Sequence, residues 1–178
     1  AVAAPPQPIW KHPASSNEHM HPQVIVIGGG VIGAASAYFL ARRGAQVLLI
    51  ERKHMGSGAS GVTASMIGLS SGITAPLKPH AVEGHRRIPT LEAETGVDLE
   101  IVRGGGLSLA SNDNEIDMLR AQQTADLEEG IEGRLIDAAE LRTMAPWVAH
   151  HLCAALHRPH NYHVNPFRLY EAYTKGAV

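Results

Sequence analysis

Three glycines at the spacing G-x-G-x-x-G carry the clearest chemical signal in this chain. Gly28, Gly30 and Gly33 follow a β-branched run at residues 24–27, which has the composition of a strand buried on both faces. Gly28 permits a sharp turn out of the strand, Gly30 lets the backbone approach a pyrophosphate, and Gly33 lets the next helix pack closely. The pyrophosphate would face free N–H groups at the positive end of that helix. The spacing therefore predicts a dinucleotide site.

A carboxylate stands where such a site needs one. Glu51 follows a second apolar strand, predicted over residues 46–50, and lies 18 residues beyond Gly33. A carboxylate there accepts hydrogen bonds from ribose hydroxyls and repels a 2′-phosphate, so an NADP-type ligand is not expected. Between the strands, the sequence predicts a helix over residues 34–43 that ends at Gly44. Strand, helix and strand make one βαβ unit, which predicts an α/β fold.

Residues 56–68, GSGASGVTASMIG, are mostly small. Small side chains and free backbone N–H groups suit a loop that wraps a ligand at close range. A flexible glycine- and serine-rich linker is the alternative. The chain becomes apolar at residues 62–69, however, which is not expected of a linker.

The motifs GGGVIG, ER and MGSGASGVTASMIG, in this order, resemble the FAD-dependent D-amino acid oxidase family, which includes glycine oxidase, sarcosine oxidase and related amino-acid and opine dehydrogenases. The resemblance implies a Rossmann-like FAD-binding domain, part of an α+β substrate domain, and FAD as the cofactor. Carried over by position, it implies that FAD is contacted by Gly28, Gly30, Val31, Ile32, Gly33, Glu51, Arg52, Ala59, Ser60, Ala64, Ser65, Met66 and Ile67.

Two features of the small-residue loop bear on how FAD would be held. Ser65 stands where the family often has glycine, so its hydroxymethyl group is expected to crowd the flavin ring or to donate a hydrogen bond. The loop also lacks the histidine that binds the flavin covalently in some relatives. The resemblance therefore implies FAD bound without a covalent link from this segment.

The activity that the resemblance implies is oxidation of the C–N bond of an amino acid or secondary amine, by hydride transfer to the flavin. No catalytic residue is assigned in this chain, because the resemblance covers only the N-terminal half of the family's fold. We expect a second polypeptide, or a missing remainder, to supply the other half. Residues 165–169, NPFRL, are also similar to subunits of multi-component dehydrogenases, which favours a heteromeric complex.

Two other functions also fit the sequence. One is an NAD-binding module of a dehydrogenase, which the βαβ unit and Glu51 fit equally well. The other is a non-catalytic subunit that only holds a cofactor or a partner.

Four parts are predicted along the chain. Residues 1–22 form an extended arm in which Trp10 is a candidate docking anchor. Residues 23–75 hold the FAD-binding βαβ unit and flavin loop, residues 76–160 a partial substrate domain, and residues 161–178 a helix that returns to the FAD domain.

Periodicity and capping residues predict the elements of the later parts. The expected strands are 97–102, 106–110, 135–136 and 153–156. The expected helices are 86–94, ended by Gly96, 114–129, capped by Asn112 or Asp113, 138–144, capped by Asp137, and 167–175. Prolines at 76 and 79 should limit helix formation before residue 86. The charged face of the 114–129 helix, which includes Asp126, is expected to be solvated.

Composition narrows the functional classes further. Of 178 residues, 44% are hydrophobic and 18% charged, and the net charge of −2 gives no support for binding nucleic acid or an anionic membrane. Cys153 is the single cysteine, so no internal disulfide forms, and it is expected to be buried. Five histidines between His150 and His163 lack partner ligands at metal-site spacing, so no metal is expected, although His160 or His163 could lie near substrate.

The chain has no apolar run long enough to span a bilayer, so no transmembrane helix is expected. We expect a cytoplasmic protein, with membrane association through a partner left open.

Overall fold

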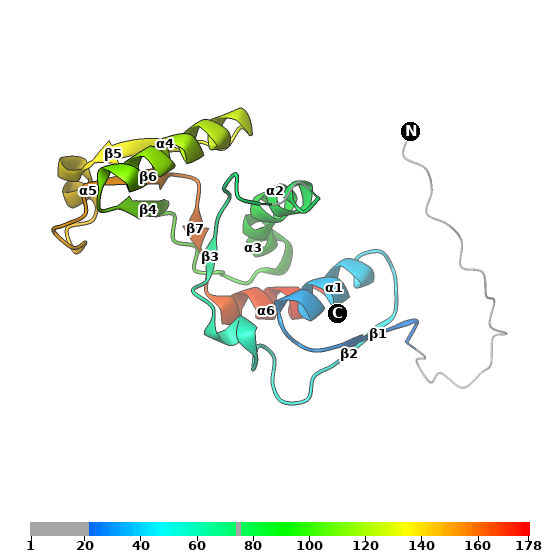
Figure 1. Cartoon of the computed structure of the whole chain (residues 1–178). Coiled ribbons are helices and arrows are strands. Elements are labelled where there is room, and N and C mark those ends of the chain that lie inside the picture. The colour runs from blue at the N-terminus through cyan, green and yellow to red at the C-terminus, as the bar shows by residue number, and fades with distance from the viewer. Residues whose placement is uncertain (1–21, 74–75) are drawn as a thin grey trace, which may run out of the picture.

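The computed structural model describes residues 22–73 and 76–178. The predicted arm, with Trp10, lies outside the described residues apart from Pro22. The elements in chain order are β1 Val24–Ile27, α1 Val31–Ala41, β2 Val47–Ile50, the 3₁₀ turn η1 Ala59–Val62, β3 Met66–Ile67, α2 Lys78–Arg87, the 3₁₀ turn η2 Ile88–Thr90, α3 Leu91–Thr95, β4 Gly106–Ala110, α4 Asp113–Glu128, β5 Arg134–Asp137, α5 Ala138–Met144, β6 Ala154–Arg158, β7 Tyr162–His163 and α6 Pro166–Lys175. Figure 1 shows β1, β2, α1 and α6 at one end and the β4–β6–β5 sheet at the other, with β3 and β7 between them.

The predicted βαβ unit is confirmed. β1 and β2 are parallel, with Val24 opposite Val47 and Ile27 opposite Ile50, and α1 packs against both strands. The helix begins earlier than predicted, so Gly33 lies within its first turn. Gly44 follows the helix with a φ of +83°, a conformation that glycine adopts at little cost.

One face of the β1–β2 pair is bare, and the prediction of burial on both faces is wrong for the described chain. Ile27 is 85% and Ile25 55% exposed, and Leu48 and Ile50 on β2 are exposed as well. The apolar composition suits a sheet covered on both sides. Here α1 covers only one side, and in the described residues no further strand pairs with either edge.

A short antiparallel pair links the two ends of the molecule. Met66 of β3 lies opposite His163 of β7, and Ile67 lies opposite Tyr162. The small-residue loop therefore runs directly into a strand that is tied to the start of α6.

The predicted substrate domain contains an antiparallel sheet in the order β4–β6–β5, with α4 and α5 packed on it (Figure 1). Asn112 and Asp137 cap α4 and α5, as predicted. Asp126 on α4 is fully buried rather than solvated, and its ion pair with Arg158 of β6 offsets the cost of burying the charge. None of the helices in the described ranges combines the length and apolar character that crossing a bilayer requires.

The predicted strand at 97–102 is wrong. Only Val102 forms a bridge, to His163, and Glu100 has a φ of +54°, which interrupts an extended chain. Val97 and Leu99 are buried. Their alternation reflects burial in a core rather than pairing in a sheet.

The predicted helix at 86–94 is also wrong, because α2, η2 and α3 divide this region. Pro79 lies in the first turn of α2, where its missing N–H would have no intrahelical acceptor, so it does not prevent the helix. Gly96 ends α3 with a φ of +67°, as predicted.

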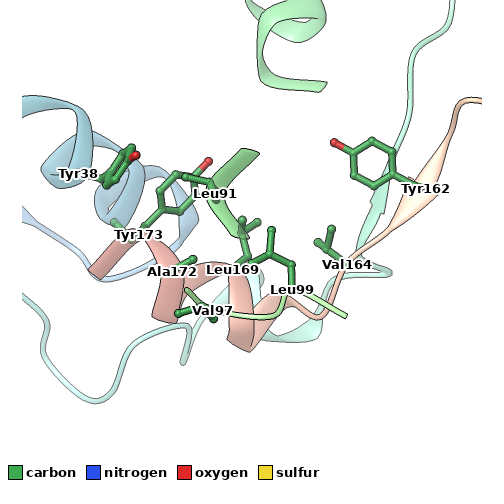
Figure 2. Packing of buried hydrophobic residues seen from close by; sticks show 10 residues of the cluster. Tyr38, Leu91, Val97, Leu99, Tyr162, Val164, Leu169, Ala172 and Tyr173 are labelled. Atoms are coloured by element: carbon green, nitrogen blue, oxygen red, sulfur yellow. The ribbon is translucent and has the colours of Figure 1, made fainter. Parts of the chain in front are cut away.

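Figure 2 shows the core that holds α6 against α1 and the segment around α3. Tyr38 of α1 and Tyr173 of α6 have ring centroids 5.5 Å apart. Leu99 and Ala172 are completely buried in the same cluster. This core positions the N-terminus of α1 and the glycine turn before it.

Candidate functional site

The turn from β1 into α1 depends on glycine at two positions. Gly28 has a φ of +106°, and its N–H donates to Ile50 O at 2.8 Å, which ties the turn to β2. A Cβ on Gly33 would lie 1.9 Å from Gly28 O. α1 can approach the strand this closely only because residue 33 has no side chain.

The N-terminus of α1 is suited to an anion. Gly30 provides no side-chain cap, and the first turn contains no acidic residue. Val31 N donates to Ser60 Oγ at 3.0 Å, and a Cβ on Gly30 would come 3.1 Å from that oxygen. Backbone N–H groups in the first helical turn have no intrahelical acceptor, so a phosphate can accept from them.

Glu51 lies beside this turn, at the end of β2. Its Oε2 accepts from Gly29 N at 2.7 Å, and its Oε1 accepts from Lys53 N at 2.8 Å. These backbone donors, that of Gly29 first, hold the pKa of Glu51 below its usual range. Each carboxylate oxygen can accept more than one hydrogen bond, so the ionised group retains capacity for ribose hydroxyls.

The small-residue loop is folded against α6. Gly56 has a φ of +73°, and a Cβ there would lie 2.2 Å from the ring of Tyr170. The Tyr170 hydroxyl donates to Ser60 O, and burial raises the pKa of that hydroxyl. A flexible linker would make no such contacts, so this alternative is not supported.

A cavity of about 300 Å³ opens between α1, the loop and α6. Several of the residues predicted to contact FAD line it, namely Val31, Ala59, Ser60, Ser65, Met66 and Ile67. The lining is largely apolar with a few polar groups, as is usual for sites that bind aromatic cofactors.

Ser65 has a φ of +60°, a left-handed conformation that residues other than glycine rarely adopt. This gives a physical reason why glycine would suit the position. The Ser65 hydroxyl donates to Thr63 O at 3.4 Å, so it takes part in a local turn.

The predicted residues Ile32, Arg52 and Ala64 are exposed and do not line the cavity. Sequence reasoning missed other lining residues, namely Thr63, Val164, Pro166, Leu169 and Tyr170. Most of these belong to α6 or precede it, and α6 was predicted only as a helix that returns to the FAD domain. The pairing of β3 with β7 is what brings them to the loop.

The clustered histidines do not form a common site. His160 pairs with Glu132 on the surface, where both side chains are 69% exposed. His163 is exposed in β7, and burial, with a smaller effect of Arg134, lowers the pKa of His157. Within residues 22–73 and 76–178, no three His, Cys, Asp or Glu side chains gather as metal ligands.

Cys153 is half-buried rather than buried, and its Sγ donates to Ala110 O at 3.4 Å.

A parallel βαβ unit, a glycine turn at the N-terminus of its helix and a carboxylate after the second strand define a dinucleotide-binding α/β protein. A family model described as "DAO: FAD dependent oxidoreductase" matches residues 23–178. The chain belongs to this family of FAD-dependent oxidoreductases, as its motifs predicted.

Curated relatives and solved structures agree with this family assignment. Glycine oxidase of Geobacillus kaustophilus is 39% identical over 107 residues, covering 57% of this chain and 28% of the relative. Human mitochondrial sarcosine dehydrogenase is 32% identical over 152 residues, covering 80% of this chain and 16% of the relative. The crystal structure of the Geobacillus glycine oxidase superposes with a TM-score of 0.79 at 33% identity, over 88% of this chain and 44% of that one. This similarity confirms the predicted fold class.

The chain thus spans less than half the length of these relatives. Whatever the remaining half contributes to activity is not contained in the residues described above.

Proposed function

We propose that this chain is the FAD-binding part of an FAD-dependent oxidoreductase that oxidises the C–N bond of an amino acid or secondary amine. The observation that carries the proposal is the ionised Glu51 beside a helix N-terminus whose N-cap residue is glycine, next to a largely apolar cavity. Glycine oxidase and sarcosine dehydrogenase, by their names, act on small amino acids and N-methyl amino acids. The same substrate class is proposed here.

The residues present fit FAD in three respects. Gly28, Gly30 and the first turn of α1 would hold the pyrophosphate, because neither glycine places a side chain in its way. Glu51 would accept from the ribose hydroxyls. The lining of the cavity, with Met66 and Ile67, would pack against the ring and exclude water. The flavin, when bound, supplies the acceptor for hydride from the substrate.

A second polypeptide, or further length of the same protein, is proposed to complete the FAD domain. The bare side of the β1–β2 pair, with Ile27 85% exposed, is an apolar surface of the kind that further elements of a doubly wound domain cover. Native mass spectrometry and size-exclusion chromatography of the purified material test this. A stable, flavin-free monomer of this chain alone would refute the idea of completion.

The domain boundaries at residues 22, 75 and 160 and a cytoplasmic location remain parts of the proposal. Limited proteolysis with mass spectrometry would test the boundaries, and cell fractionation would test the location.

The decisive experiment is an absorbance spectrum of the assembly, followed by dye reduction with glycine, sarcosine and iminodiacetate. Bound flavin absorbs at about 450 nm, whereas a nicotinamide cofactor does not. A yellow assembly that an amine bleaches supports the proposal, and a yellow assembly that no amine bleaches favours a non-catalytic, cofactor-holding subunit.

Glu51→Gln tests the site within the same assay. The neutral amide accepts weaker hydrogen bonds from the ribose hydroxyls than the carboxylate does, so FAD affinity should fall by about tenfold or more. The control is Glu128→Gln on α4, remote from the cavity, which should leave FAD affinity unchanged. Equal FAD affinity in both variants would contradict the assignment of Glu51.

A further inference from the structure

The buried polar side chains of the described residues gather in one place. They are Asp126 on α4, Arg158 on β6 and Asn161 before β7, which are 0%, 4% and 8% exposed. Asn161 Oδ1 accepts from Leu69 N at 3.1 Å. Asp126 Oδ1 accepts from Ser71 N at 2.7 Å. Together they fasten the segment that leaves β3 and the cofactor cavity to the β4–β6–β5 sheet.

Arg158 has more donors than the protein satisfies. Its Nε donates to Asp126 Oδ2 at 2.8 Å, and its Nη1 donates to Ser108 Oγ at 2.9 Å. Nη2 is itself buried and lies 2.6 Å from the same Asp126 oxygen, as part of the same ion pair, but makes no hydrogen bond among the described residues. A guanidinium carries five N–H bonds and no acceptor, and an unpaired buried donor is costly.

A cavity of about 280 Å³ lies beside this guanidinium. Its polar lining comes from Ser70, Ser108, Gln122, Arg158 and Asn161, and no acidic side chain lines it. The carboxylate of Asp126 does not line the cavity, and it is engaged by Arg158 and Ser71 N. The lining is therefore rich in donors, which suits an anionic or carbonyl-bearing ligand.

The amide of Asn161 is held in a fixed orientation. A Cβ on Gly68 would lie 2.8 Å from its Nδ2, and a Cβ on Gly106 would lie 3.0 Å from it. Because Oδ1 accepts from Leu69 N, Nδ2 is the atom that remains to donate. The donor set thus exists before any ligand binds.

This cavity adjoins the cofactor cavity, because Met66 of β3 lines both. We propose that it is an anion subsite, in which Arg158 binds a carboxylate at the end of the substrate remote from the oxidised C–H bond. The guanidinium has more N–H groups than Asp126 and Ser108 accept from, so a carboxylate in the cavity gains a charge-assisted hydrogen bond that a neutral tail cannot accept. The inference rests on the proposed function and narrows it to amines with an acidic tail, with Arg158 as a specificity-determining residue.

Probes that differ by one carboxylate test the subsite in the flavin-loaded assembly as it is isolated. Iminodiacetate and sarcosine are the oxidisable pair, compared by kcat/KM in dye reduction. Glutarate and butyrate are their nitrogen-free analogues, compared by calorimetric Kd. The member with the additional carboxylate should be favoured by about tenfold or more in each pair, the size expected for one charge-assisted hydrogen bond.

Two variants probe the cavity from different sides. Gln122→Met removes donors without touching the buried ion pair, and Arg158→Lys keeps a positive charge beside Asp126 but leaves fewer N–H groups for a ligand. Both should reduce the preference for the acidic tail by about tenfold. Gln123→Met is the control, because this neighbouring amide donates to Gly133 O at 3.0 Å and does not line the cavity.

A purely structural role would lower both members of each pair in parallel and leave the ratio unchanged, which would overturn the subsite. Equal binding of glutarate and butyrate by the parent protein would overturn it as well. A colourless assembly that reduces no dye would refute the proposed function instead. The glutarate and butyrate comparison would still decide the subsite, because it needs no flavin.

Discussion

The substitution Gly33→Ala tests the close approach of α1 to β1, on which the cofactor site depends. A Cβ at residue 33 would lie 1.9 Å from Gly28 O, a backbone atom that cannot rotate away. The two must separate by about 1 Å to reach the 3.0 Å below which real Cβ atoms are essentially not found. Overpacking of this kind costs about 1–3 kcal/mol of the free energy of unfolding.

The same shift displaces the N–H groups that would hold the pyrophosphate, so FAD affinity should fall by about tenfold or more. Thermal unfolding and flavin titration of the purified assembly measure the two effects. For a protein of this size, each kcal/mol lowers Tm by about 2–4 °C.

Gly84→Ala is the matched control. Gly84 lies within α2, and a Cβ there would meet nothing within 4 Å. Replacing a glycine in an open helical position should stabilise the protein by about 0.5–1 kcal/mol. The two alanine variants are thus expected to change Tm in opposite directions. If Gly33→Ala behaved like the control, in Tm and in FAD affinity, the reasoning about the turn would be wrong.

Three further changes test the packing around the sites. Asp126→Asn leaves Arg158 buried without its countercharge and should lower the free energy of unfolding in urea by about 3–5 kcal/mol. Asp117→Asn, at an exposed ion pair, should lower it by less than about 1 kcal/mol. Similar losses in the two variants would contradict the burial of the Asp126–Arg158 pair. Asn165→Ala removes the cap of α6, whose oxygen accepts from two backbone N–H groups, and should cost about 1 kcal/mol by thermal unfolding; an unchanged Tm would argue against this cap. Burial lowers the pKa of His85 below its ordinary 6.5, so the unfolded chain binds more protons just below that pH. The free energy of unfolding should therefore fall as pH drops below about 6.5, and His85→Gln should flatten this dependence; an unchanged pH profile in that variant would exclude His85 as its source.

Local signals account for the elements that the sequence predicts correctly. The βαβ unit, the caps Asn112 and Asp137, and the end of α3 at Gly96 each depend on neighbours within a few residues. The prediction at residues 97–102 failed because alternating burial is common to strands and to loops packed under a helix. Pro79 was misjudged because the start of α2 was not recognised, and proline is tolerated in a first turn.

Long-range contacts account for what was missed. The lining contributed by Leu169 and Tyr170 depends on the pairing of β3 with β7 across nearly a hundred residues of chain, which no local pattern encodes. Asp126 looked like one of several surface carboxylates on α4, because its partner Arg158 belongs to a strand far along the sequence.

The amino-acid order was sufficient to predict a dinucleotide site, because a glycine turn, a helix and a terminal carboxylate must be close together in sequence to act on one pyrophosphate and one ribose. The small-residue loop at 56–68 added the resemblance that predicted the family and FAD. Folding was needed to show which surfaces meet: the loop on α6, the bare side of β1 and β2, and the donor-lined cavity at Arg158. Each of these features forms where segments distant in sequence pack together. The free energy of such packing depends on the folded arrangement, which the residues adjacent in sequence do not determine.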